Sequence, residues 1–351
     1  MKRTKKILML VLCVLLVGAL VFTGCDAPAN VEDDGDSSST TQEGGDGEKK
    51  FKVGFANSSL DNPWRISIQN TIEEEFAKYP EVELITNEAG EDPIRLNNNI
   101  EDMISQGVDL ILCCTVESEP FEVSAELCQK EGVPLILVDR GIESGNYTCF
   151  IQQSNFQIGY DAADWAAEQM VARYGEEKGK VVELQGVPGN LPAEQRKTSF
   201  HEQVEKEHPG LEIVAAQPTD YSRANSLEVM ENVLQAQSEV DVVYTHEDEI
   251  ALGAIKALEE AGREEGVLVI GNGGSKDAIE AVKEGKMACC MLYSPIDFGK
   301  LAVETAMQFL NGEEIEKDII FTGGMVTAEN VDQYIAQLEE TGSTHVSTIE
   351  Q

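Results

Sequence analysis

The chain has 351 residues, with 26 Lys and Arg against 64 Asp and Glu, and a formal net charge of −38 at pH 7. This length suits two domains or one two-lobed protein, and a hydrophobic content of 42% excludes a wholly disordered chain. The excess of acids excludes nucleic acid as a partner, because such binding rests on Lys and Arg that neutralise phosphates.

The first residues have the pattern of an export signal. Four basic residues within 1–6 precede an uncharged apolar run at 7–22, which is shorter than the roughly 20 apolar residues that a membrane-spanning helix needs. The sequence FTGC at 22–25 then resembles a bacterial lipobox, in which the signal is cut before a cysteine that receives lipid. We expect a lipoprotein signal peptide at 1–24 and lipid attachment at Cys25. An ordinary signal peptide or an uncleaved anchor is the alternative.

The segment that follows predicts an acidic, flexible tether over 25–50. Residues 26–50 contain eight acids, many Gly, Ser and Thr, and no large apolar residue beyond Val31. Such a segment cannot bury enough apolar surface to offset the entropy lost on ordering. The expected location is therefore extracytoplasmic, with the folded body anchored by lipid to the cell membrane.

From Phe51 onward, short apolar runs alternate with segments of helical spacing, such as Ile68, Ile72 and Phe76. This alternation predicts parallel sheets built by right-handed crossovers. About ten such units exceed one small sheet, so we expect an α/β fold of two doubly wound parallel-sheet lobes with a cleft between them. The expected strands are 51–56, 109–114, 134–138, 180–185, 211–215, 240–245, 266–270 and 287–292.

The cysteine pattern is unlike that of a disulfide scaffold. Two pairs of cysteines are adjacent in the sequence and lie inside apolar runs, and no CxxC or zinc spacing occurs. We expect buried free thiols, with one disulfide as the alternative that an exported protein allows. Beyond Cys13 in the signal and Cys25, the cysteines are Cys113, Cys114, Cys128, Cys149, Cys289 and Cys290.

Motifs of catalysis and cofactor binding are absent from the sequence. It has no GxSxG, no phosphate-binding P-loop and no HExxH, and Lys276 stands where a dinucleotide fingerprint would need a third glycine. The acids in 246–249 lie where a strand meets a helix, so capping or ligand contact is expected there rather than a metal. We expect no cofactor, no metal and no catalytic residue. An extracellular enzyme that uses 246–249 is the alternative.

Polar and aromatic residues at the ends of expected strands mark a candidate site. Asn62 is placed to cap the helix after the first strand. Trp64 and Arg65 follow it and would face the cleft, because ligands in such folds bind beyond the carboxyl ends of strands. Asp139 and Arg140 end a later strand in the same way, with a plain surface loop as the alternative.

Five segments together resemble the ribose and galactofuranose periplasmic-binding family, the exported solute receptors of ABC importers. The resemblance covers about 51–325, and the Trp-Arg pair is closer to the galactofuranose-binding members. The segments are NSSLDNPWR at 57–65, LILVDR at 135–140, VVELQGVPGNLPAEQRKTSF at 181–200, QPTDYSR at 217–223 and VVYTHEDEIALGAIKALEEAG at 242–262.

The resemblance implies a periplasmic-binding protein type I fold, with lobes joined by a three-strand hinge near Gln153, Tyr293 and Thr322. The N-lobe would be 51–153 plus 294–322, and the C-lobe 154–293 plus 323–351. The resemblance also implies a ligand site formed by Ser58, Asn62, Trp64, Arg65, Asp139, Arg140, Arg196, Tyr221, Glu247, Asn272 and Tyr293.

Three positions depart from the family pattern. Glu247 stands where Asn is usual, Asn272 where Asp is usual, and Tyr293 where Gln or Asn is common. An acid has in effect moved from 272 to 247, so the ligand groups read at these positions must differ. A sugar suits the whole set, because aromatic rings can cover its CH faces and planar polar groups can hydrogen-bond its hydroxyls. The acid at 247 favours an amino-bearing ligand as an alternative.

These features predict an extracytoplasmic solute-binding lipoprotein that captures a monosaccharide and delivers it to an ABC permease. We expect a monomer with no enzymatic step that closes around its ligand by a hinge motion. Two alternatives stay open: a ligand-sensing receptor for a chemoreceptor or histidine kinase, and an importer receptor for a non-sugar small molecule.

Overall fold

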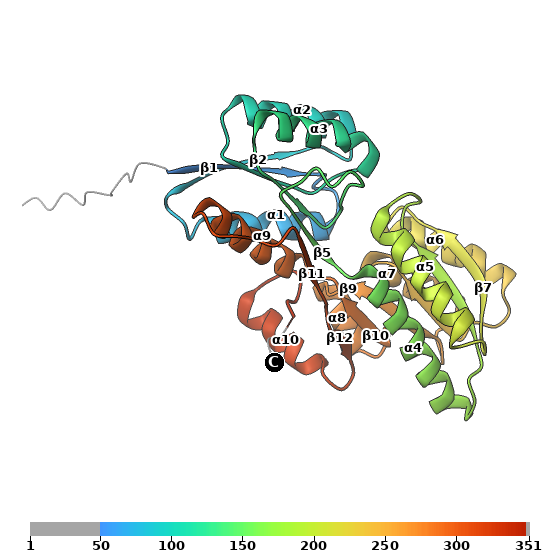
Figure 1. Ribbon diagram of the computed structural model, residues 1–351. Coiled ribbons are helices and arrows are strands. Elements are labelled where there is room, and N and C mark those ends of the chain that lie inside the picture. Colours follow the sequence, from blue (N-terminus) through green and yellow to red (C-terminus); the bar gives the residue numbers. More distant parts are fainter. Residues whose placement is uncertain (1–49, 349–351) are drawn as a thin grey trace, which may run out of the picture. The chain divides into compact units, whose positions relative to one another are not determined.

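The computed structural model describes residues 50–348. The predicted signal peptide, the lipid site at Cys25 and the tether up to residue 49 lie outside the described residues. Within 50–348, no helix combines the length and the apolar character needed to cross a membrane. The described chain folds into two six-stranded sheets, each covered by helices on both faces (Figure 1).

The first sheet is entirely parallel and runs in the order β11-β5-β4-β3-β1-β2. Its strands are β1 (Phe51–Asn57), β2 (Val82–Glu88), β3 (Leu110–Cys113), β4 (Leu135–Val138), β5 (Cys149–Gln153) and β11 (Asp318–Phe321). Helices α1 (Pro63–Phe76) and α9 (Pro295–Leu310) pack side by side on one face, and α2 (Pro93–Ser105) and α3 (Ser118–Glu131) on the other (Figure 1). Strands β3 and β4 are apolar throughout because helices bury both of their faces.

The second sheet runs in the order β12-β10-β9-β8-β6-β7. Its strands are β6 (Gly179–Gln185), β7 (Leu211–Pro218), β8 (Val242–Thr245), β9 (Leu268–Gly273), β10 (Cys289–Leu292) and β12 (Met325–Thr327). All neighbours are parallel except β12, which is antiparallel to β10. The packed helix pairs are α4 (Asn155–Tyr174) with α5 (Leu191–Lys206), α6 (Arg223–Ala236) with α7 (Asp248–Ala261), and α8 (Lys276–Lys283) with α10 (Val331–Thr341).

The chain passes between the two sheets three times: after β5, after β10, and between β11 and β12. The crossings pack tightly, because Gln153 Nε2 donates a 2.6 Å hydrogen bond to the carbonyl oxygen of Leu292. A Cβ at position 323 would lie only 2.1 Å from that same oxygen, so the third crossing requires Gly323. The predicted fold class, two doubly wound lobes joined by a three-stranded hinge, is confirmed.

Helix caps fix the loops that follow several strands. Asn62 caps α1 by accepting a 2.8 Å hydrogen bond from the Trp64 amide, and Pro occupies the first helical turn, as the sequence predicts. Ser154 caps α4 and Asn190 caps α5 in the same way. Each cap ends a loop at the carboxyl end of a strand, so capping fixes the loop backbone where a ligand would bind.

The six cysteines of the described part are buried and unbridged, so the alternative of a disulfide is not supported. Burial raises the pKa of Cys114 and of Cys128 to about 12. Thiols that stay protonated in apolar surroundings are unreactive. These residues therefore act as small apolar side chains of the core.

Candidate ligand-binding site

A cleft of about 1250 Å³ is lined by loops from both sheets. The first sheet contributes the loops after β1, β2, β3 and β4, and the second the residues at or after the ends of β6, β7, β8 and β9. The carboxyl ends of strands in open α/β sheets are where ligands bind. The cleft exceeds the roughly 300–1,000 Å³ of pockets that enclose small ligands, so a monosaccharide would fill only part of it.

Ten of the eleven residues that the sequence predicts for the site line this cleft. Ser58 is the exception: its side chain is fully buried and lies off the cleft wall, so it offers no direct contact in this arrangement. The ten lining residues are Asn62, Trp64, Arg65, Asp139, Arg140, Arg196, Tyr221, Glu247, Asn272 and Tyr293.

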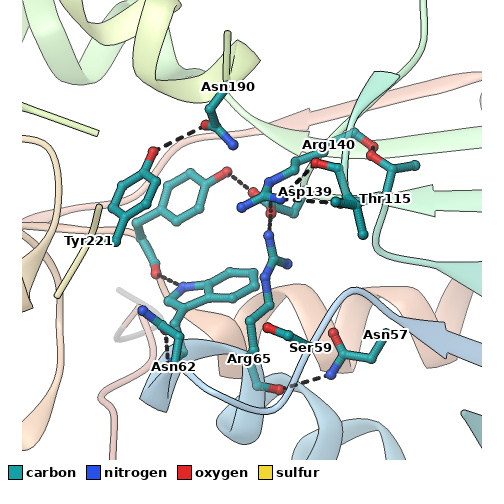
Figure 2. Close-up of polar contacts among 12 residues, drawn as sticks. Asn57, Ser59, Asn62, Arg65, Thr115, Asp139, Arg140, Asn190 and Tyr221 are labelled. Carbon is teal, nitrogen blue, oxygen red and sulfur yellow. Dashed lines mark hydrogen bonds and ion pairs between the residues drawn. The ribbon is translucent and has the colours of Figure 1, made fainter. Parts of the chain in front are cut away.

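Asp139 is the centre of a buried polar network on the first-sheet side (Figure 2). Arg65 Nη2 donates to Asp139 Oδ2 at 2.6 Å, and the Tyr293 hydroxyl donates to Asp139 Oδ1 at 2.5 Å. Burial alone would raise the pKa of Asp139, but the guanidinium groups of Arg65 and Arg140 and the Tyr293 hydrogen bond lower it. The carboxylate is therefore ionised and rigidly held, with its remaining lone pairs available to hydroxyl donors.

Arg140 is held by the loop after β3. Its Nη1 donates to the carbonyl oxygens of Thr115 at 3.3 Å and Val116 at 3.0 Å, as Figure 2 shows for Thr115. Glu91 Oε2 lies 3.7 Å from Arg140 Nη1, and Asp139 Oδ2 lies 3.8 Å from Arg140 Nε. The guanidinium is thus positioned at the wall by backbone acceptors while its charge is balanced by two acids.

Tyr293, which follows β10, connects the two sides of the site. Trp64 Nε1 donates a 2.7 Å hydrogen bond to the Tyr293 carbonyl oxygen, and the two ring centroids are 5.8 Å apart. The Arg196 guanidinium lies 4.4 Å from the centroid of the Tyr293 ring, a cation–π distance. Residues from α1 and α5 therefore meet on one aromatic ring at a crossing between the sheets.

Arg196 is buried and oriented by two hydrogen bonds. Its Nε donates to Asn155 Oδ1 at 2.8 Å, and its Nη1 donates to the His246 carbonyl oxygen at 2.5 Å. Asn155, in the first turn of α4, was missed in the sequence because nothing local distinguishes it from any residue after the Ser154 cap. The two hydrogen bonds fix the Arg196 guanidinium before a ligand arrives.

Glu183, which the sequence analysis also missed, lies fully buried in β6 beneath this wall. Its carboxylate bonds His246 Nε2 at 3.0 Å and His201 Nε2 at 2.8 Å. His246 Nδ1 accepts from the Gly186 amide, so Nε2 carries the proton that it donates to Glu183. Burial would raise the pKa of Glu183, but the two histidine hydrogen bonds lower it to about 2. The network supports His246, whose carbonyl orients Arg196.

Glu247 and Asn272 follow the neighbouring strands β8 and β9. Glu247 caps α7 by accepting a 2.6 Å hydrogen bond from the Glu249 amide, which confirms the capping interpretation of 246–249. Burial, with the adjacent Asp248, raises the pKa of Glu247 well above its usual range. Within residues 50–348, no three His, Cys, Asp or Glu are placed to share a metal ion.

Tyr221 brings an aromatic side chain to the cleft from the loop after β7. Its hydroxyl donates to Asn190 Oδ1 at 3.2 Å (Figure 2). A Cβ at Gly186 would lie 2.1 Å from the Tyr221 hydroxyl oxygen, so only glycine leaves room for the ring. Burial raises the pKa of Tyr221, so this hydroxyl remains a hydrogen-bond donor.

Backbone strain is concentrated at the cleft. Among residues 50–348, the non-glycine residues with positive φ are Glu91 at 56°, Asp139 at 74° and Tyr221 at 65°, and all three line it. Such conformations cost of order 1–3 kcal/mol each and persist where the surroundings force them, commonly at ligand sites. The strain marks this cleft as the candidate functional site independently of any sequence motif.

Comparison with known proteins places the fold in a class. A family model described as a periplasmic binding protein domain matches residues 53–314. The ribose import binding protein of Bacillus subtilis (strain 168) is 35% identical over 272 residues, which cover 77% of this chain and 85% of that protein. This chain therefore belongs to the periplasmic binding protein family.

Two solved structures extend the comparison. An ABC transporter solute binding protein from Bacillus halodurans C-125, with bound myo-inositol, is 29% identical with a TM-score of 0.75, covering 84% of this chain and 100% of that one. The fructose binding periplasmic domain of a hybrid two-component system is 28% identical with a TM-score of 0.75, covering 83% and 95%. The shared architecture spans nearly all of the described residues.

Proposed function

We propose that this chain is an extracytoplasmic receptor that binds a monosaccharide or related polyol in its cleft and delivers it to an ABC importer. The observation that carries the proposal is the Asp139 network, in which a buried carboxylate is fixed by Arg65 and Tyr293 at the carboxyl ends of strands. The relatives' ligands support it, because ribose and myo-inositol are both polyhydroxylated.

The proposed ligand contacts are the ten lining residues named above. Carboxylate, amide and guanidinium groups form directional, charge-assisted hydrogen bonds with hydroxyls. Residues of both sheets line one cleft, so a ligand that touches both would favour a closed form. The lobes in this proposal are 51–153 plus 294–322 and 154–293 plus 323–351, and the ligand is released unchanged.

The primary test is a thermal-shift screen of the full-length protein in detergent against pentoses, hexoses, inositols, linear polyols, nucleosides and amino acids. A ligand at 100 times its Kd adds about 2.7 kcal/mol to the free energy of unfolding, which raises Tm by several degrees. Stabilisation by at least one sugar or polyol is expected. The absence of stabilisation by any polyol at millimolar concentration, with a response to another class, would overturn the proposal.

Arg196 provides a sharper test of the site. Arg196→Ala removes a buried guanidinium from the cleft, and truncating one partner of a buried charged hydrogen bond costs about 2–5 kcal/mol of binding, roughly 30-fold or more in Kd. Arg95→Ala is the matched control, because Arg95 pairs with Glu88 on the surface, away from the cleft. Calorimetry should show lost affinity only for Arg196→Ala. Equal affinities in the two variants would remove Arg196 from the site.

Attachment of the mature chain to the membrane through lipid on Cys25 is part of the proposal. The support is the lipobox-like sequence at 22–25 and the acidic spacer that follows it. Cys25→Ser should move the protein from the membrane fraction to the soluble extracytoplasmic fraction while sugar binding is kept. A membrane-bound Cys25→Ser protein would point to an uncleaved anchor instead.

A sensory role is the second candidate, because the fructose-binding neighbour belongs to a two-component system. Deletion of the gene separates the two roles. Loss of ligand uptake is expected for an importer receptor. Normal uptake with loss of the transcriptional response to the ligand would favour the sensor.

A further inference from the structure

The charges that line the cleft are strongly unbalanced. Its wall carries eleven Asp and Glu side chains and four arginines, with no lysine or histidine. An acidic cleft concentrates cations and repels anions before any contact forms. The excess of negative charge does not by itself identify a ligand, so the position of each charged group must be considered.

The arginines are already engaged by protein groups. Arg65 pairs with Asp139, and Arg223 pairs with Glu249 and Asp277. Arg140 lies beside two carboxylates and bonds backbone carbonyls, as described above. The charges of three of the four arginines are thus offset by carboxylates, although Arg65 Nη1 itself has no hydrogen-bond partner within residues 50–348. The cleft therefore offers little excess positive charge for a phosphate or carboxylate, and a sugar phosphate or sugar acid is disfavoured.

On the second-sheet side of the cleft, one acidic side chain lacks a basic partner within the described residues. Glu247 has no ion-pair partner within residues 50–348, and the hydrogen bond that its carboxylate accepts is from the Glu249 amide. Arg196 is the cation near enough to affect it, and that guanidinium bonds Asn155 and the His246 carbonyl oxygen. Glu247 is thus a cleft-lining carboxyl group whose remaining acceptor capacity is unused.

Asn272 gives an independent indication at the same place. It is 1% exposed, and its Nδ2 donates to the His246 carbonyl oxygen at 3.4 Å, which directs the amide oxygen away from that carbonyl. Its Oδ1 makes no hydrogen bond within the described residues. A buried acceptor without a donor costs about 1–3 kcal/mol. The ends of the paired strands β8 and β9 therefore present two acceptors, a carboxylate and an amide oxygen, to one cleft.

From this juxtaposition we propose that the ligand is a polyol bearing a protonated amino group, an amino sugar or aminocyclitol, whose ammonium lies between Glu247 and Asn272 Oδ1. The proposal rests on the proposed function and specifies its ligand class. An ammonium has three donors and no acceptor, so it matches two acceptors better than a hydroxyl, which must also accept. It also supplies the positive charge that the unpaired carboxyl lacks.

The proposal has a protonation consequence. The pKa of Glu247 is raised by burial and by Asp248 and Glu249, against the opposing effects of the Glu249 amide hydrogen bond and Arg196. Burial, with a smaller contribution from the charge of Glu247, raises the pKa of Tyr221 in the loop after β7. An ammonium beside Glu247 would lower the pKa of Glu247, so binding should release a proton from the carboxyl group. Neutral polyols should bind with no such release.

The test compares matched pairs by calorimetry on the full-length protein in detergent: glucosamine with glucose, galactosamine with galactose, and an inosamine with the corresponding inositol. We expect at least one amino member to bind at least 100-fold more tightly than its hydroxyl partner, with proton release seen as a dependence of the heat on buffer ionisation enthalpy. If no amino member binds more tightly than its partner, the inference is overturned.

Two variants assign the effect to its residues. Glu247→Gln keeps the shape and removes the charge, so the ratio of the Kd of the hydroxyl partner to that of the amino member should fall to less than 10-fold. Glu119→Gln is the matched control, since Glu119 is an exposed cleft-lining acid on α3. Equal losses in both variants would mean that only the general field of the cleft matters, which contradicts the proposal. Neutral polyols that bind without any amino preference would leave the proposed function standing, whereas binding of neither class would overturn both.

Discussion

At the scale of single residues, Asp139 shows how the site is held in place. It has φ of 74°, it is 5% exposed, and both carboxylate oxygens receive donors from the protein. The strain and the desolvation are tolerated because Arg65, equally buried, supplies a full counter-charge at 2.6 Å. Each member of the pair would be costly to bury without the other.

We therefore predict that Asp139→Asn lowers the free energy of unfolding by about 3–5 kcal/mol, because it leaves the Arg65 charge buried without a counter-charge. The double variant Arg65→Gln with Asp139→Asn should recover at least half of that loss. Urea denaturation of the two single variants and the double variant measures the coupling. Additive losses would mean that the pair does not interact in the way the distance suggests.

The sequence located these residues but not their partners. Trp64, Arg65 and Asp139 could be placed at strand ends by the spacing of apolar runs. The bonds from Arg65 and Tyr293 to Asp139 could not, because these residues are 74 and 154 positions from it in the chain. Ser58, which the resemblance places in the site, is fully buried and does not line the cleft, and its Oγ has no hydrogen-bond partner within the described residues.

At the scale of elements, His208 links α4 to the loops beside β6 and β7. Its Nε2 lies 2.7 Å from Asp164 Oδ1, and its Nδ1 lies 3.0 Å from Glu177 Oε2. Burial would lower the pKa of His208, but its hydrogen bonds with Asp164 and Glu177 outweigh burial and raise it. The link is therefore strongest when the imidazole is protonated.

The sign of the pH dependence follows from that raised pKa. Stability from the charged His208 is fully present below its unfolded value of 6.5 and is lost as pH rises through the higher folded pKa. We predict that the difference in the free energy of unfolding between wild type and His208→Gln is largest near pH 6 and shrinks toward pH 9. It should stay within about 1 kcal/mol, because Asp164 is half exposed and solvent screens the pair.

Chemical denaturation across that pH range provides the measurement. Lys206→Gln is the control, because Lys206 is a charged neighbour on α5 whose ion pair with Glu202 is solvent-exposed. Its effect should not vary with pH over this range. A His208→Gln effect that grows as pH rises would contradict the assigned direction.

Three of the four strands that the sequence did not predict, β2, β11 and β12, lie at the edges of their sheets. All eight expected strands are present, but β2, β5, β11 and β12 were not predicted as strands. Edge strands bury only part of their surface, and β2 and β11 alternate or are half exposed where central strands are continuously apolar. β12 is three residues long and depends on pairing with β10, a contact between distant parts of the chain.

At the scale of the whole molecule, the formal net charge of −38 should oppose compactness. Like charges repel more in the folded state than in the expanded chain, and salt screens exposed charges with a Debye length of about 10 Å at 0.1 M. We predict that raising NaCl from 10 mM to 0.5 M increases Tm by several degrees. Calorimetric scans at fixed pH measure this.

The control for that experiment is choline chloride at the same ionic strength. Equal shifts in both salts would identify screening, whereas a shift in NaCl alone would indicate binding of sodium. A constant or falling Tm would mean that exposed ion pairs, such as those of Lys256 and Lys286, lose more by screening than the net charge gains.

The sequence by itself determined the class of this protein: its acidity, the alternation of strands and helices, and the polar residues at strand ends follow from local composition and periodicity. The tertiary structure decided which groups meet. The Asp139 network, the orientation of Arg196 by Asn155, and the cleft-lining acceptors of Glu247 and Asn272 involve residues of different strands and helices. Contacts of that kind depend on how helices pack on the sheets, and no local pattern in the chain encodes them.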